Sequence, residues 1–178
     1  MNPKPNNRDT VDLSFKDHII LLYFFIAFYP DEKISNNEKK ILEKLLMNEV
    51  FPEMSKYAFE NCHTVMANVL NECETAQDSL DRFEQSLTQV EEMIPNENII
   101  TDPNYTMFPE KNKLEKLLRD LVEIATADGL FADALKMLQT AAIVWGFEVY
   151  EDKERVEIVN FMKWDKWDGY GEEYDLEN

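Results

Sequence analysis

Glycine is scarce in this chain, and we find no run of alternating apolar and polar residues as long as a β-strand. The sequence has four glycines in 178 residues. Together the two absences predict an all-α protein, because alternating strands and their tight turns depend on those features. A chain of this length fits one domain and can bury a substantial core without disulfides.

Basic residues are also few. The sequence has 18 Lys and Arg against 36 Asp and Glu, which gives a formal net charge of -18. Such a charge repels nucleic acid and anionic lipid, and it attracts cations and basic protein surfaces. The composition therefore argues against direct nucleic-acid binding and favours a protein partner.

Cysteine is nearly absent as well, since Cys62 and Cys73 are the only two. If one helix carries both, their spacing puts them roughly 16 Å apart, which is too far for a disulfide. The N-terminal arm, residues 1–11, has no apolar core that would form a secretory signal, and we expect it to be disordered. We therefore expect a cytoplasmic protein whose thiols are reduced and have no metal or redox role.

The longest apolar run, residues 19–28, is too short to cross a bilayer, which requires about 20 such residues. Consecutive apolar side chains over this length also cannot form a single stripe on a surface helix, so other helices must cover the segment on most sides. The run therefore predicts a buried central helix in a bundle, and no direct insertion of the chain into a membrane.

Capping residues, prolines and glycines divide the chain into helices. Ser14 with Asp17 and Ser35 with Glu38 have the spacing of a capping box, and Thr75 can cap a later helix. These boundaries, together with the apolar periodicity between them, predict about seven helices, at residues 14–29, 35–51, 52–73, 75–94, 110–127, 132–145 and 151–162.

The predicted helices form a single domain, residues 12–163, in which the turn-rich segment 95–109 is the hinge between two halves. Residues 164–178 form an acidic tail that begins with Trp164 and Trp167. These tryptophans can pin the end of the chain against the bundle, or they can form part of a partner surface.

Two segments of the chain, residues 25–38 and 122–135, read alike when they are aligned. Each has an apolar helix, an aspartate just past its end (Asp31 and Asp128), an apolar residue three positions later, and then a new helix. This order predicts two helix-turn-helix units that pack about an approximate two-fold axis around the buried apolar helix.

The repeated turn resembles that of the tellurite-resistance TerB-like family, in which an apolar helix is followed by Ala-Asp-Gly, an apolar residue, a capping residue and a glutamate. The positions that match are Asp31, Ile34, Ser35 and Glu38 in the first turn, and Ala127, Asp128, Gly129 and Phe131 in the second. The positions that depart from the pattern are Pro30, Glu32, Ala132 and Leu135. The resemblance implies a bacterial cytoplasmic helical bundle, linked to stress response and to membrane-anchored complexes, whose acidic turns bind a divalent cation.

The acidic residues of these turns are the candidate metal ligands, namely Asp31, Glu32, Glu38 and Asp128. Their carboxylates are hard oxygen ligands that suit Ca²⁺ or another divalent cation, provided that the two turns converge. The alternative is that Asp31 and Glu38 stabilise the start of the following helix through capping and the helix dipole. Both interpretations fit the sequence.

The sequence contains no pattern of residues that clearly indicates a catalytic site. His18 and His63 are the only histidines, and Cys62 and His63 are helical neighbours whose side chains point about 100° apart, which does not suit a nucleophile and its base. No zinc-ligand cluster or glycine-rich phosphate loop occurs. We therefore expect a non-enzymatic protein, either a TerB-like docking module or an acidic inhibitor or immunity-type protein that binds a basic protein partner.

Overall fold

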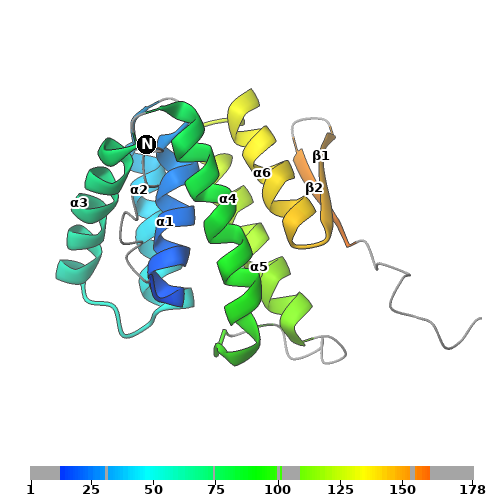
Figure 1. The fold of residues 1–178 in the computed structure, drawn as a ribbon, viewed down its shortest axis with the longest axis horizontal. Coiled ribbons are helices and arrows are strands. Elements are labelled where there is room, and N and C mark those ends of the chain that lie inside the picture. Colours follow the sequence, from blue (N-terminus) through cyan, green and yellow to red (C-terminus); the bar gives the residue numbers. More distant parts are fainter. Residues whose placement is uncertain are drawn as a thin grey trace, which may run out of the picture.

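The computed structural model describes residues 13–30, 32–73, 75–99, 101, 109–152 and 155–160. In chain order, these contain α1 (Phe15–Phe28), α2 (Asn36–Lys44), the π-helical segment η1 (Leu45–Val50), α3 (Lys56–Glu72), α4 (Ala76–Met93), the 3-10 turn η2 (Ile94–Asn96), α5 (Pro109–Ala125), α6 (Ala132–Val144), β1 (Phe147–Asp152) and β2 (Arg155–Asn160). The predicted helical bundle is confirmed, with a small two-stranded sheet added to it (Figure 1).

The central helix is α1, as the apolar run predicts. Every residue from Ile19 to Ala27 is buried, and α1 packs against α2, α3, α4 and α5. A capping box between Ser14 and Asp17 begins the helix, which ends just before Pro30. Among the described residues, no helix combines the length and the apolar character that crossing a membrane requires.

The capping box predicted at Ser35 also forms, and Thr75 caps its helix as predicted. The Ser35 side chain accepts a hydrogen bond from the Glu38 backbone N–H at the start of α2, and Thr75 accepts one from Asp78 at the start of α4. Because each cap satisfies a backbone donor that lacks a partner inside the helix, the three serine and threonine positions fix where α1, α2 and α4 begin.

The predicted helix at residues 52–73 begins later than expected. Pro52 and Glu53 form a turn, and α3 starts at Lys56, where the Ser55 hydroxyl accepts a hydrogen bond from the Ala58 backbone N–H at 3.1 Å. A serine cap therefore decides the helix start in place of a proline in the first helical turn. This shift leaves Phe51, Pro52 and Glu53 free to line a groove.

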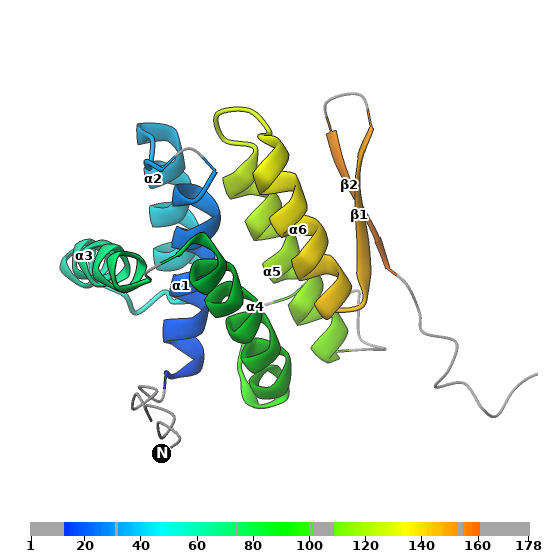
Figure 2. The same ribbon diagram turned by 45° about the horizontal axis from the view of Figure 1, so that its top comes forward.

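The predicted helix at residues 151–162 is wrong, because β1 and β2 form an antiparallel hairpin here. The register pairs Val149 with Ile158 and Glu151 with Val156. Phe147 and Val149 are buried while the residue after each is exposed, so the segment alternates with the period of a strand. The hairpin lies beside α6 (Figure 2).

A lysine and a tryptophan connect α6 to the rest of the bundle. The Lys111 ammonium donates to the backbone carbonyls of Trp145 and Gly146 at 2.6 and 2.7 Å, and it lies 4.0 Å from the centroid of the Phe147 ring. The buried Trp145 indole N–H donates to the Leu87 carbonyl at 3.0 Å. These contacts fix the end of α6, where Gly146 has a φ of +73°.

Two further predictions fall on residues outside the described part of the chain. The arm at residues 1–11 and the tail at 164–178, including Trp164 and Trp167, are not among the described residues, so both predictions stay open.

Candidate functional site

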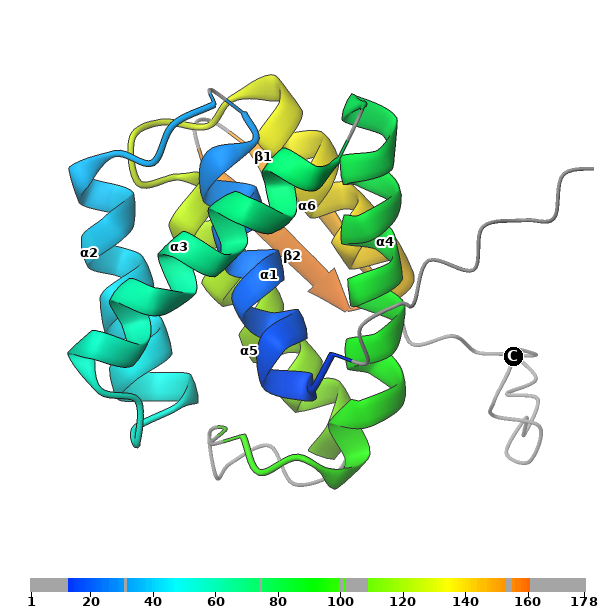
Figure 3. The same ribbon diagram turned by 60° about the vertical axis from the view of Figure 1, so that its left-hand side comes forward.

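The two turns that the internal repeat predicts to be equivalent lie against each other. The Asn37 side-chain amide, at the start of α2, donates to a carboxylate oxygen of Asp128, in the turn between α5 and α6, at 2.7 Å. The two residues are 91 positions apart. Figure 3 shows both turns at the same end of the bundle.

Two carboxylates of these turns, those of Glu38 and Asp128, accept hydrogen bonds. Hydrogen bonds from the Ser35 and Asn37 side chains lower the pKa of Asp128, which is exposed. The Glu38 carboxylate, which is buried, accepts from the Ser35 backbone N–H at 2.8 Å. Ser35 thus contacts both acidic residues, and the capping interpretation of Glu38 accounts for its position.

Glu32 is exposed in the turn after α1 and has a φ of +60°. This is the left-handed region that favours glycine, which the TerB-like pattern has at the same position. Asp31 lies outside the described residues. Within the described part of the chain, no three His, Cys, Asp or Glu side chains group in a way that could hold a metal ion. Cation binding at Glu32, Glu38 and Asp128 therefore stays a prediction.

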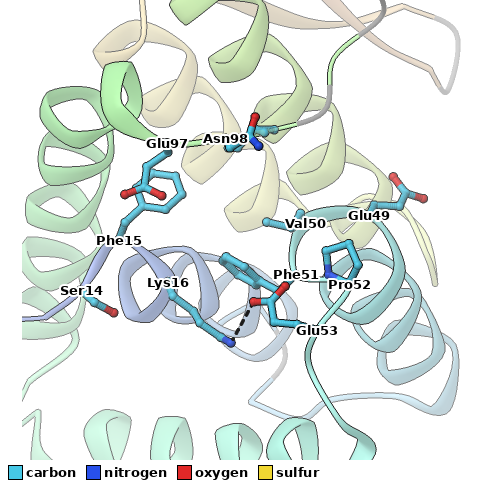
Figure 4. Close-up of a pocket in the computed structure, with 11 residues that line it drawn as sticks. Ser14, Phe15, Lys16, Glu49, Val50, Phe51, Pro52, Glu53, Glu97 and Asn98 are labelled. Carbon is cyan, nitrogen blue, oxygen red and sulfur yellow. Dashed lines mark ion pairs between the residues drawn. The ribbon is translucent and has the colours of Figure 1, made fainter.

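A groove that the sequence did not indicate opens at the other end of α1. It has a volume of about 580 Å³, within the range of protein ligand sites. The start of α1, the end of η1 with the turn after it, and the segment after η2 form its walls (Figure 4). Its lining residues are Ser14, Phe15, Lys16, Glu49, Val50, Phe51, Pro52, Glu53, Glu97, Asn98 and Ile99.

The groove, which we call the acidic groove, combines an apolar floor with charged walls. Phe15, Val50 and Ile99 are buried. Three of the lining residues are glutamates and one, Lys16, is basic. An extended segment with both apolar and cationic side chains would complement this surface, because the apolar groups can be buried while the cations meet carboxylates.

Lys16 forms one polar corner of the acidic groove. Its ammonium lies 3.6 Å from a carboxylate oxygen of Glu53, and 5.0 Å from the centroid of the Phe51 ring. Figure 4 shows this ion pair between Lys16 and Glu53 as a dashed line. The Lys16 and Glu53 side chains are 39% and 69% exposed, so water reaches this corner.

Glu49, at the edge of the acidic groove, is held by two lysines. Its carboxylate oxygens lie 3.1 Å from the Lys116 ammonium and 3.5 Å from that of Lys44. Burial is the largest single influence and raises the pKa of Glu49, but the hydrogen bonds and charges of the two lysines together outweigh it and lower the pKa. The two lysines offset the charge of Glu49, so the remaining carboxylates of the groove are those of Glu97 and of Glu53, which pairs with Lys16.

The shape of η1 contributes to this groove. The Phe51 backbone N–H donates to the Leu46 carbonyl at 2.8 Å, a spacing of five residues. Such π-helical turns are rare in proteins as a whole, but those that occur are often found at functional sites. The wider turn follows directly after α2, and its end places Val50 and Phe51 at the groove.

Cys62 and His63 show no sign of a catalytic pair. Burial raises the pKa of the Cys62 thiol, which keeps it protonated and weakens it as a nucleophile. The His63 ring packs edge-on against Phe24 at a centroid distance of 5.7 Å. Both Cys62 and Cys73 are free thiols.

The chain matches no protein-family model, no curated protein and no solved structure. The resemblance to the TerB-like family therefore stays a prediction from the two turns.

Proposed function

We propose that this protein is a non-enzymatic docking module whose acidic groove binds a cationic segment of a protein partner. The observation that carries the proposal is the groove itself, in which buried Phe15, Val50 and Ile99 lie beside Glu53 and Glu97. The net charge of -18 supports it, because a strongly acidic surface speeds the encounter with a basic partner.

The dimensions and chemistry of the groove favour a short peptide segment. A volume of about 580 Å³ accommodates a few side chains. The buried floor would take an apolar side chain of the partner, and the glutamates would take lysine or arginine side chains next to it. One partner that could present such a segment is a basic enzyme. This protein would then act as an inhibitor or immunity-type protein of that enzyme.

The test is a binding titration with a short fluorescein-labelled peptide that repeats Leu-Arg-Gly, followed by fluorescence anisotropy. Replacement of both groove glutamates, Glu53→Gln with Glu97→Gln, should weaken binding about tenfold or more, because the partner's cations lose their carboxylates. The matched control is Glu148→Gln with Glu157→Gln, which removes the same charge from the exposed surface of the hairpin.

The control pair should leave the affinity within about twofold of the unmodified protein, since distant exposed charges are largely screened at physiological salt. Equal weakening by both pairs would mean that net charge alone attracts the peptide, and it would contradict the proposal. An unmodified protein that fails to bind the peptide would contradict it as well.

A second candidate function, TerB-like cation binding, is favoured by the contact between Asn37 and Asp128, which brings the two acidic turns together. Thermal unfolding with and without Ca²⁺ tests it. A cation at a hundred times its dissociation constant would stabilise the folded state by about 2.7 kcal/mol. If the protein binds Ca²⁺ in this way, Asp128→Asn should reduce the shift; an unchanged melting temperature in the unmodified protein would exclude the site at the concentrations used.

A further inference from the structure

One corner of the acidic groove already holds a cation that belongs to the protein itself. The Lys16 ammonium lies over the face of the Phe51 ring, 5.0 Å from its centroid, and 3.6 Å from a carboxylate oxygen of Glu53. An aromatic face beside a carboxylate is a common arrangement for recognising lysine and arginine side chains. The corner therefore has the chemistry of a cation-binding subsite.

We propose that this corner is the subsite for an arginine side chain of the partner, and that Lys16 occupies it as an internal competitor until the partner binds. The inference depends on the proposed function, because it names the group that the acidic groove recognises. It assigns Phe51 and Glu53 as the residues that determine specificity and Lys16 as the residue that limits affinity.

The Lys16 ammonium can leave this corner at little cost in stability. Its side chain and that of Glu53 are both substantially exposed, and ion pairs of this kind contribute little to stability. The long lysine stem can swing its ammonium into water without leaving a buried charge. Release of Lys16 then frees the face of Phe51 and one carboxylate of the groove.

Arginine fits the vacated corner better than lysine does. Its planar guanidinium can stack on the Phe51 ring while it makes two parallel hydrogen bonds to the Glu53 carboxylate. A lysine ammonium is a compact, strongly hydrated charge that offers no such fork. The proposal therefore expects the Leu-Arg-Gly peptide to bind more tightly than a peptide that repeats Leu-Lys-Gly.

The experiment measures the affinity of the Leu-Arg-Gly peptide for two lysine variants with the same net charge. Lys16→Met removes the competitor and keeps a similar apolar stem, and it should tighten binding about threefold to tenfold. Lys39→Met, at an exposed position of α2 that does not line the groove, changes the total charge equally and should leave the affinity within about twofold.

A third variant separates competition from a simple gain in local negative charge. Phe51→Leu removes the aromatic face and keeps an apolar side chain. When Phe51→Leu is added to Lys16→Met, most of the gain should disappear, and the preference for arginine over lysine should disappear with it. Circular dichroism spectra and melting temperatures of each variant confirm that it is folded.

The outcomes distinguish the inference from the proposed function. If the unmodified protein binds the peptide through Glu53 and Glu97 while Lys16→Met and Lys39→Met behave alike, the inference is overturned and the docking function stands. A gain in Lys16→Met that persists without the Phe51 ring also overturns the inference, since local charge then explains it. If neither the unmodified protein nor Lys16→Met binds the peptide, both are overturned.

Discussion

The Tyr23 hydroxyl donates a hydrogen bond of 2.6 Å to the Asp120 carboxylate in the interior of the bundle, and this bond joins α1 to α5 across 97 positions of sequence. The Lys116 ammonium donates to both oxygens of the same carboxylate at 2.9 Å. Burial is the main cause that raises the pKa of Tyr23 and of Asp120, which are both buried. This contact therefore holds the central apolar helix at a defined register against α5.

The first prediction concerns this contact. Tyr23→Phe should destabilise the protein by about 1 to 3 kcal/mol, because a buried carboxylate loses one of its donors. The measurement is urea unfolding followed by circular dichroism. The control is Tyr57→Phe, whose side chain is 81% exposed and whose effect should stay within about 0.5 kcal/mol. Equal effects of the two substitutions would show that the bond to Asp120 contributes nothing measurable.

The second prediction concerns pH. Burial raises the pKa of Asp120 even though the charge and hydrogen bonds of Lys116 and the Tyr23 hydroxyl oppose it, whereas hydrogen bonds from Ser35 and Asn37 lower the pKa of Asp128. Carbon-13 NMR titration of the two carboxyls should therefore give midpoints on opposite sides of about 3.9, the usual value for aspartate.

The same shifts have opposite effects on the free energy of unfolding. The contribution of Asp120 is fully present below its unfolded-state pKa and is lost as the pH rises through its higher folded-state pKa. The contribution of Asp128 is present above its unfolded-state pKa and is lost as the pH falls through its lower folded-state pKa. Midpoints in the reverse order would contradict both the effect of burial on Asp120 and the effect of the hydrogen bonds on Asp128.

The third prediction tests the meeting of the two turns. Asn37→Ala and Asp128→Ala remove the two ends of one hydrogen bond, so the double variant should be less destabilised than the sum of the single variants. Chemical unfolding of all four proteins gives the coupling. A pairing of Asn37→Ala with Asp152→Ala, at an exposed position of the hairpin, should be additive. Additivity in both pairs would mean that the turns do not cooperate.

The fourth prediction concerns the end of α6. Lys111→Met should cost about 1 to 3 kcal/mol of stability, because the carbonyls of Trp145 and Gly146 lose a charged donor. Lys136→Met removes an exposed lysine that pairs with Asp133 within the same helix, and it should cost less than about 0.5 kcal/mol. Differential scanning calorimetry compares the two, and a larger loss in Lys136→Met would contradict this account.

The parts of the fold that local sequence determines could be predicted. The apolar run at residues 19–28 gave the buried helix, and the side chains of Ser14, Ser35 and Thr75 gave three helix starts. In each case the signal lies within a few residues. A capping box requires particular residues three positions apart, and a fully buried helix requires consecutive apolar residues.

The hairpin was missed although the sequence contains its signal. Val149, Val156 and Ile158 are β-branched residues, which strands favour, and each follows a charged residue. The segments are short, and a short apolar run cannot be assigned to a helix or to a strand from its periodicity alone. Gly146, with its positive φ, ends α6 and allows the change from helix to strand.

The acidic groove could not be predicted from sequence spacing. Its residues come from three segments around Phe15, Phe51 and Ile99, and only tertiary packing brings them together. Each segment taken alone reads as a helix end or an irregular connection. For the turns, the sequence indicated Asp128 as a candidate, but it could not show that a hydrogen bond from Asn37 would engage its carboxylate.

The measurement that tests the central claim most directly is a nitrogen-15 NMR titration of the full chain with the Leu-Arg-Gly peptide. The acidic groove predicts that the largest amide shifts occur at residues 14–16, 49–53 and 97–99, with little change at the hairpin or at the turn that contains Asp128. Shifts spread evenly over the acidic surface, or centred on the hairpin, would contradict a docking function for the groove.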